Sequence, residues 1–286
     1  MKNYKSLTMP NSEYRDHIGA ANSDLLLIER SASDYIWSRN APIDESKTAA
    51  FDFGTALHTA LLEPEKFNAQ VVIYSQTKTR ETKAFQDFLA EHNEESKIIL
   101  LESEYDKLRF TVDGAKYHPT VNRLLTCPSD KESSIFVNDK ARDIVRKIRP
   151  DLDYCNHGKL LLADAKSTDK ISDWREYAPW KNPFLTRNYV HTAAYYMDTA
   201  SIFYGEQINE YTFIVIQKHI EMGRYPVAAI KITREELNGL GAFDQMNYNL
   251  DKYANCLHSN DWDEVERFPL FNNKFDDDIE VTLLEG

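Results

Sequence analysis

The stretch RPDLDYCNHGKLLLADAK, residues 149–166, decides the expected fold because it has the pattern of a β-hairpin. The tripeptide NHG at residues 156–158 is a turn signal, since Asn and Gly tolerate the positive φ angles of tight turns. With a two-residue turn, antiparallel pairing places Asp151 directly opposite Asp164 on one face of the sheet, with Cβ atoms about 5 Å apart. The hairpin therefore predicts two facing carboxylates.

Two carboxylates so close would repel each other unless a cation lay between them, and hard oxygen ligands are those that Mg²⁺ prefers. Lys166 follows Asp164 by two residues, so strand alternation returns it to the same face. Ala165 points away, although its backbone carbonyl can still reach a metal ion. In phosphodiester hydrolysis such a lysine could orient the attacking water or offset charge on the phosphorane. The hairpin thus predicts a magnesium site with Asp151 and Asp164 as ligands and Lys166 as a catalytic residue.

The same residues also allow a structural interpretation. An Asp-x-Lys tripeptide alone occurs by chance in most chains of this length. Lys147 and Arg149 share the face of Asp151 in this register, so the cluster could instead be a surface salt-bridge ladder. A bulge in place of the two-residue turn would break the register. Spacing alone leaves both interpretations open.

Outside the hairpin, apolar periodicity and turn residues predict an α/β or α+β layer fold. The central order is a helix, three strands, a helix and a strand. The expected strands lie at residues 71–74, 133–138, 142–149, 159–166, 210–217 and 225–232. The expected helices lie at residues 22–37, 51–62, 102–117, 185–204 and 234–257, and one more helix follows a basic loop at residues 77–83.

Composition describes an ordinary globular protein. The chain has 286 residues, 42% of them hydrophobic, which is enough for one large domain or two small ones. It has no signal-peptide pattern and no stretch apolar enough to cross a membrane. Its three cysteines are scattered without a CxxC pair, which argues against a disulfide framework or thiolate zinc site and suits a reducing compartment such as the cytoplasm.

A net charge of −12 counts against a protein that binds DNA tightly. A local basic lining can still act, because charges are screened beyond roughly 8 Å in cells. The sequence also has no phosphate-binding glycine loop, no HExxH and no plausible serine or cysteine triad. These absences narrow the enzyme classes that need to be considered.

Arg149-Pro150-Asp151 followed by Asp164-Ala165-Lys166 resembles the signature of the PD-(D/E)xK nuclease superfamily. Four other segments are similar to the RecE-type exonucleases, also called exonuclease VIII, of the RecB-like branch, and the likeness runs from about residue 11 to residue 262. These segments are LLIERSASDYIWSRNAP (26–42), FDFGTALHTALLEPEKF (51–67), ESSIF (132–136) and GRYPV (223–227).

The resemblance implies a restriction-endonuclease-like core, a mixed sheet flanked by helices, in a single nuclease domain over residues 1–286. A helical part at about 11–100 would carry His58, the nuclease core would span about 101–260, and an acidic tail would occupy 263–286. Like its relatives, the protein would digest duplex DNA from the 5′ end with Mg²⁺, for which Mn²⁺ can substitute, and leave 3′ single-stranded tails. It would act as a ring-like homo-oligomer with a RecT-like single-strand annealing protein, in phage or prophage recombination within a bacterial host.

The resemblance also assigns roles to individual residues. Asp151 and Asp164 match the family's metal ligands, and Lys166 matches its catalytic lysine. His58 matches a histidine that the RecB-like branch places near the metal, and Glu132 matches a glutamate at the start of the first core strand, with a metal-binding and catalytic role. Without the family, His58 would be interpreted as a core histidine and Glu132 as a solvated strand end.

One motif departs from the family pattern. The RecB-like branch usually carries Gln-x-x-x-Tyr on the helix after the Asp-x-Lys strand, and here the matching residues are His191 and Tyr195. Both are expected on one helical face in catalytic roles, with His191 donating to a phosphate. Core packing is the alternative for Tyr195.

Seven basic residues are candidates for contact with DNA phosphates, although a run of charges is commonly only a solvated face. The alternative functions are a non-catalytic DNA-end binding or scaffold protein, and a related nuclease with single-strand or endonucleolytic preference. The basic candidates are Lys78, Arg80, Lys83, Arg142, Arg146, Lys147 and Arg224.

Overall fold

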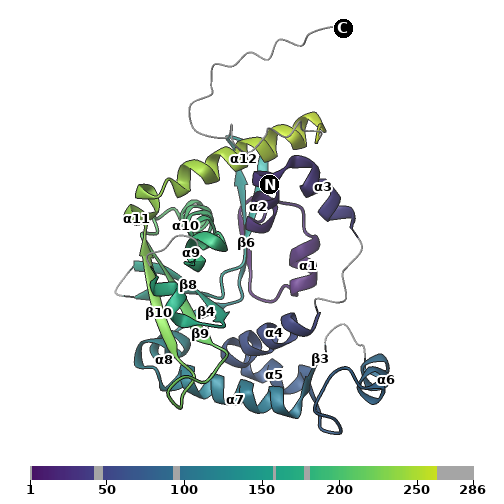
Figure 1. Cartoon of the computed structure of the whole chain (residues 1–286). Coiled ribbons are helices and arrows are strands. Elements are labelled where there is room, and N and C mark those ends of the chain that lie inside the picture. The colour runs from purple at the N-terminus through teal and green to yellow at the C-terminus, as the bar shows by residue number, and fades with distance from the viewer. Residues whose placement is uncertain (1, 42–47, 93–96, 157–158, 177–180, 263–286) are drawn as a thin grey trace.

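A computed structural model describes the chain except residues 1, 42–47, 93–96, 157–158, 177–180 and 263–286. The predicted turn at 157–158 and the predicted acidic tail therefore lie outside the described residues. Within them, helices cover both faces of a mixed central sheet (Figure 1). The expected fold class is confirmed.

The central sheet has five strands, and strand β8 lies in its middle. β8 and β9 are parallel, whereas the other neighbouring pairs are antiparallel, so the sheet is mixed as predicted. A middle strand is covered on both faces, which explains the unbroken apolar run of β8. The strand order is β10 (Val227–Thr233), β9 (Glu210–Gln217), β8 (Lys159–Thr168), β7 (Leu152–Asn156) and β4 (Ser129–Lys131).

The two faces of this sheet enter two different hydrophobic cores. Along β9, Phe213 and Val215 face one core, while Ile214 and Ile216 face the other, as the two-residue period of a strand requires. The first core is built with α2 (Asn22–Arg30), α3 (Ala32–Asn40), α10 (Tyr189–Tyr204), α11 (Arg234–Gly239) and α12 (Ala242–Ser259), and the second with α4 (Thr48–Leu62), α7 (Glu102–Tyr117) and α8 (Pro119–Thr126).

The strands predicted at 133–138 and 142–149 do not join the central sheet. They form β5 (Ser134–Asp139) and β6 (Ile144–Ile148), which pair in a second sheet with β1 (Tyr4–Ser6). The three predicted successive strands therefore belong to two sheets, because the first arm of the predicted hairpin is a separate strand, β7, between β6 and β8. The remaining elements are the parallel pair β2 (Val71–Tyr74) and β3 (Ile98–Leu101), helices α1 (Asn11–Asp16), α5 (Pro64–Gln70), α6 (Lys83–Glu91) and α9 (Pro183–Thr186), and the 3-10 helix η2 (Ile171–Arg175).

Three helices predicted as continuous are each broken in two. Ser31 ends α2 and caps α3 by accepting from the backbone N–H groups of Ser33 and Asp34, so the predicted helix at 22–37 is wrong. Asn188 at φ 54° separates α9 from α10, and Gly241 at φ 69° separates α11 from α12. These left-handed residues stop a helix, and Asn and Gly are the residues that adopt this conformation most readily.

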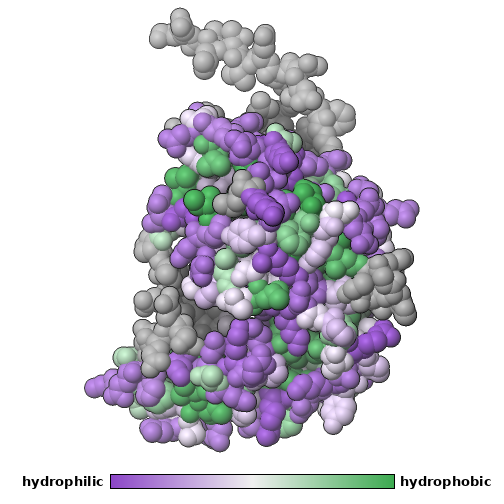
Figure 2. All heavy atoms as spheres, turned by 180° about the vertical axis from the view of Figure 1, so that it is seen from behind, coloured by the Kyte–Doolittle hydropathy of each residue, from purple (hydrophilic) through white to green (hydrophobic). Residues whose placement is uncertain are grey.

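The surface carries no single apolar face on the side seen in Figure 2, where hydrophobic residues form small patches between hydrophilic ones. Among the described residues, none of the helices combines the length and the apolar character needed to span a bilayer.

Candidate functional site

The β7–β8 hairpin brings two aspartates together in the register that the sequence predicts. Leu152 pairs with Ala163, so Asp151, one residue before β7, faces Asp164. The backbone N–H of Asp151 donates to Asp164 Oδ1 at 3.4 Å. Both side chains are buried, with 6% and 4% of their surface exposed, so the two carboxylates meet away from bulk water.

The Asp151 carboxylate is held by polar groups on both sides. Its Oδ2 accepts a 2.6 Å hydrogen bond from the backbone N–H of Ala165, and it lies 3.3 Å from His58 Nδ1 on α4. Burial would raise the pKa of Asp151, but the charge of His58, together with these hydrogen bonds, lowers it below the usual value. Asp151 is therefore an ionised carboxylate.

The pKa of Asp164 is shifted in the opposite direction from that of Asp151. Burial and the neighbouring charge of Asp151 raise its pKa, although Lys166 opposes this shift. The Lys166 ammonium forms an ion pair with Asp164 Oδ2 and lies 5.8 Å from the centroid of the Tyr189 ring. Burial would lower the pKa of Lys166, but the charges of Asp164 and Asp151 raise it, so the side chain stays cationic. A cation at this position can donate hydrogen bonds but cannot act as a base.

Glu132 joins the site from the segment between β4 and β5. Its Oε1 lies 4.0 Å from His58 Nδ1, and its Oε2 accepts from Arg149 Nε at 2.9 Å. Its backbone N–H donates to the carbonyl of Asp151 at 3.2 Å, which fixes the segment against the hairpin. Glu132 adopts φ 50°, a left-handed conformation that is costly for a residue other than glycine.

The negative charge of Asp151 raises the pKa values of both groups that face it, Glu132 and His58. For Glu132, burial and the Asp151 charge raise the pKa to about 7. For His58, burial acts to lower the pKa, yet the charge and hydrogen bond of Asp151 raise it to about 9. Each group therefore holds a proton that a bound cation would displace.

These residues meet the distance requirement for a metal centre. One ligand atom from each of His58, Glu132 and Asp151 lies within 4.8 Å of the others. Two carboxylates and an imidazole suit a hard or borderline divalent cation, with imidazole favouring Mn²⁺ over Mg²⁺. Asp164 faces this group, but its Oδ2 is bound by Lys166, so the structure brings together three of the four predicted side-chain ligands in one triangle.

The structure places His191 and Tyr195 away from these carboxylates. His191 Nδ1 lies 2.9 Å from Asn22 Oδ1, its Nε2 lies 3.3 Å from Asn249 Nδ2, and burial lowers its pKa to about 4. The fully buried Tyr195 donates its hydroxyl to the carbonyl of Ala20 at 2.5 Å. The structure therefore brings neither side chain to the hairpin carboxylates, and the core alternative describes Tyr195.

The next tyrosine on α10 has the position that was expected of Tyr195. Tyr196 donates its hydroxyl to the carbonyl of Arg149 at 3.4 Å, directly before Pro150 and Asp151. Burial raises its pKa well above the usual value, and the charges of Asp164 and Asp151 add to this shift. Tyr196 therefore contacts the backbone that leads into Asp151, a contact that the sequence did not predict.

Four of the predicted DNA-contact residues have internal partners instead. Arg80 forms a two-pronged ion pair with Glu104, and Lys147 donates to backbone carbonyls at the end of α1. Arg146 is 3% exposed and bridges Asp139 and Asp198, while Arg142 binds Asp139 and Asp251. These contacts correct the prediction, because such groups stabilise the fold and are not free for phosphates. Lys78, Lys83 and Arg224 are exposed, as the prediction requires.

The salt-bridge ladder is also excluded by these contacts. Lys147 points toward α1, and Arg149 turns to Glu132, to the hydroxyl of Ser134 and to the carbonyl of Met9. Neither side chain pairs with Asp151. Arg149 thus has a role that the sequence did not assign, as the partner that positions Glu132.

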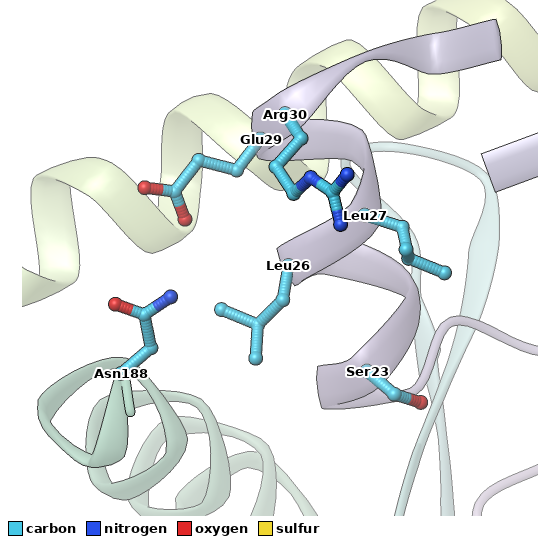
Figure 3. Close-up of a pocket in the computed structure, with 6 residues that line it drawn as sticks. All are labelled: Ser23, Leu26, Leu27, Glu29, Arg30 and Asn188. Carbon is cyan, nitrogen blue, oxygen red and sulfur yellow. The ribbon is translucent and has the colours of Figure 1, made fainter. Parts of the chain in front are cut away.

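Two pockets of the described chain lie apart from this site. One, of about 530 Å³, lies between α2 and the start of α10 and is lined by Leu26, Leu27, Glu29 and Asn188 among others (Figure 3). A second, of about 490 Å³, lies between α10 and α12 and includes His191. None of the residues that line them belongs to the group around Asp151.

Comparisons with known proteins agree with this geometry. A family described as "PDDEXK-like domain of unknown function (DUF3799)" matches residues 22–265, most of the chain. Among solved structures, one described as a "Putative exonuclease" from Eubacterium rectale superposes with a TM-score of 0.58 at 12% identity, over 92% of this chain and 96% of that chain. A search of curated proteins gave no match. At this identity the structural likeness shows the fold alone.

Proposed function

Because the chain belongs to the family of PDDEXK-like domains, we propose that it is a metal-dependent nuclease that hydrolyses phosphodiester bonds of DNA. The observation that carries this proposal is the facing pair Asp151 and Asp164 with the Lys166 ammonium beside it. Burial of two carboxylates and a lysine together costs desolvation energy. Such clusters of perturbed charged groups are typical of functional sites.

His58, Glu132 and Asp151 would hold the divalent cation. When bound, the cation would polarise a phosphate oxygen and lower the pKa of a bound water. Asp164 holds the Lys166 ammonium in place, and Lys166 would donate to the attacking water or to an oxygen of the phosphorane. Arg149 keeps Glu132 directed at His58, so it is a positioning residue.

The finer activity follows from the family resemblance. We propose Mg²⁺-dependent digestion of duplex DNA from the 5′ end, which yields 3′ single-stranded tails for a RecT-like annealing protein. A ring-like homo-oligomer would enclose the duplex. The resemblance of segments 26–42, 51–67, 132–136 and 223–227 to RecE-type exonucleases supports this reading.

Digestion of end-labelled linear duplexes tests the proposal. Duplexes labelled separately at the 5′ and 3′ ends are incubated with the protein and Mg²⁺, Mn²⁺ or a chelator. We expect early release of the 5′ label only, and no release with chelator. Asp164→Asn should lower the rate by roughly 10²-fold or more, whereas the control Asp251→Asn, at an exposed residue of α12, should not.

Each outcome selects one function. Absence of metal-dependent digestion together with retention of DNA ends in a gel-shift assay would support the non-catalytic scaffold instead. Release of the 3′ label first, or nicking of a circular substrate, would keep the nuclease and overturn the polarity.

A further inference from the structure

Glu132 lies at the corner where the chain passes from one sheet to the other. β4 of the central sheet ends at Lys131 and β5 of the second sheet begins at Ser134, so only Glu132 and Ser133 connect the two strands. The φ angle of Glu132, 50°, is costly for a glutamate, and a residue keeps such a conformation only where its surroundings hold it. The contacts on both sides of Glu132 therefore set the direction of its carboxylate.

These contacts meet at the ammonium group of Lys5. β1 pairs with β5 so that Lys5 lies opposite Ile135 in the second sheet. From there Lys5 Nζ donates to two carboxylates of the central sheet, to Asp130 Oδ2 on β4 at 2.7 Å and to Asp153 Oδ2 on β7 at 2.6 Å. It also donates to the hydroxyl of Tyr204 at 2.7 Å. An ammonium group has three N–H donors, so all of them are used, and Lys5 joins the two sheets.

Asp153 extends this connection to the other side of Glu132. The Oδ2 atom of Asp153 also accepts from the hydroxyl of Ser133, the residue after Glu132, at 2.9 Å. Asp153 and Asp130 are direct partners across β7 and β4, so the Lys5 ammonium compensates two facing carboxylates. The side chain of Asp153 is 3% exposed, so loss of the ammonium would leave a buried charge without this compensation.

We propose that Lys5 is a positioning residue for the metal centre. Through its bond to β4 it fixes the chain two residues before Glu132. Through Asp153 it fixes Ser133, the residue after Glu132. Both connections keep the Glu132 carboxylate near His58, where the divalent cation would bind. The inference rests on the proposed function, because it takes Glu132 as a metal ligand.

Affinity for Mn²⁺ in the absence of DNA tests this role without requiring hydrolysis. Calorimetry compares the wild type with Lys5→Met, which removes the ammonium, and with Lys5→Arg, which keeps a cation with several donors. We expect Lys5→Met to weaken Mn²⁺ binding by roughly tenfold, as is usual for residues that support metal ligands. Lys5→Arg should restore most of the affinity. Wild-type affinity in Lys5→Met would overturn the proposal.

A matched control separates positioning from general destabilisation. Arg146, on β6 of the same sheet as Lys5, is also a buried cation between two carboxylates, those of Asp139 and Asp198. Lys5→Met and Arg146→Met should therefore both lower the free energy of unfolding, but only Lys5→Met should weaken Mn²⁺ binding. An equal loss of Mn²⁺ affinity in the two variants would show that Lys5 acts only on stability, against the proposal.

A double-mutant cycle asks whether Lys5 acts through Glu132. Residues that act through one another have non-additive effects, so Lys5→Met should change the affinity of Glu132→Gln by less than roughly twofold. The full loss in this background would overturn the proposal. If Lys5→Met does not fold, Asp130→Ala replaces it, since this variant leaves the pair of Lys5 with Asp153 in place. Asp130→Ala should also weaken Mn²⁺ binding, and unchanged affinity would contradict the role of Lys5.

Failure of the proposed function would give a different result. Equal Mn²⁺ binding by the wild type and by Asp151→Asn would reject the metal centre itself, and with it the nuclease proposed on that centre. Binding that depends on Asp151 but not on Lys5 would reject only the positioning role of Lys5.

Discussion

The carboxyl groups of Asp151 and Asp164 face each other across the β7–β8 hairpin, and their pKa values shift in opposite directions. Burial opposes ionisation of both, but Asp151 is next to His58 and the N–H of Ala165, whereas Asp164 feels the charge of Asp151. Lys166 then compensates Asp164 directly. Environment thus distinguishes two identical side chains, because Asp151 faces His58 whereas Asp164 pairs with Lys166.

Replacement of the lysine tests this division. Lys166→Gln should lower the rate of DNA digestion by roughly 10²–10³-fold, the usual cost of losing one donor that stabilises a transition state. Binding of DNA in Ca²⁺ should change only a few-fold. Steady-state rates and anisotropy measure the two effects, with Lys97→Gln, at a half-exposed lysine that donates to the carbonyl of Ala69, as the control. Weakening of binding without a change in rate would argue against a catalytic lysine.

Metal binding should release protons, because His58 is protonated and Glu132 is partly protonated at neutral pH. The pKa of Glu132 is about 7 and that of His58 about 9, and each must be deprotonated to act as a ligand. We therefore expect release of about one and a half protons for each Mn²⁺ bound at pH 7, and of about one at pH 8. Calorimetry in buffers with different ionisation enthalpies measures this number. Release of no protons would show that the cation binds elsewhere.

Stability of the metal-free protein should depend on His58 above neutral pH. Its folded pKa of about 9 lies above the unfolded value near 6.5, so the folded state binds the proton more tightly. The stabilisation is fully present below pH 6.5 and is lost as the pH rises through 9. His58→Gln should flatten the free energy of unfolding over this window by roughly 1–3 kcal/mol. His258→Gln, at a surface histidine of α12, should leave the dependence intact, and an unchanged profile for His58→Gln would contradict the assignment.

His191 should act on the acid side with the opposite sign. Burial lowers its pKa to about 4, so the unfolded chain binds this proton more tightly. Stability should therefore fall as the pH decreases from 6.5 to 4. His191→Gln can keep hydrogen bonds to Asn22 and Asn249 and should remove this loss. Chemical denaturation at pH 4.5 and pH 7 measures the difference, and a loss of equal size in the variant would refute the role of His191.

The hairpin could be predicted from the sequence because its register depends on local signals. A turn at 157–158 and strand alternation were enough to place Asp151 opposite Asp164 and Lys166 beside it. The break between β6 and β7 escaped prediction, because the hairpin pattern does not show where its first strand begins. Asp153 is buried there only because Lys5, Ser133 and Tyr204, distant in sequence, bind its carboxylate.

The face of α10 could not be predicted, because the helix is buried almost all round. Its buried residues run nearly without interruption from Val190 to Tyr195, so periodicity does not show which side meets the hairpin. The sequence therefore did not show that Tyr196, and not Tyr195, contacts the segment before Asp151. The partners of the basic residues could not be predicted either, because Arg146 and Asp198 are far apart in the sequence and meet only in the folded chain.

Anomalous diffraction from crystals soaked in Mn²⁺ tests the central claim most directly. We predict one strong peak in contact with Asp151, at an oxygen distance of about 2.1 Å as for similar hard cations, with Glu132 and His58 as further ligands. The peak should vanish in Asp151→Asn. A peak away from Asp151, or no peak in crystals of a protein that still digests DNA, would contradict the account.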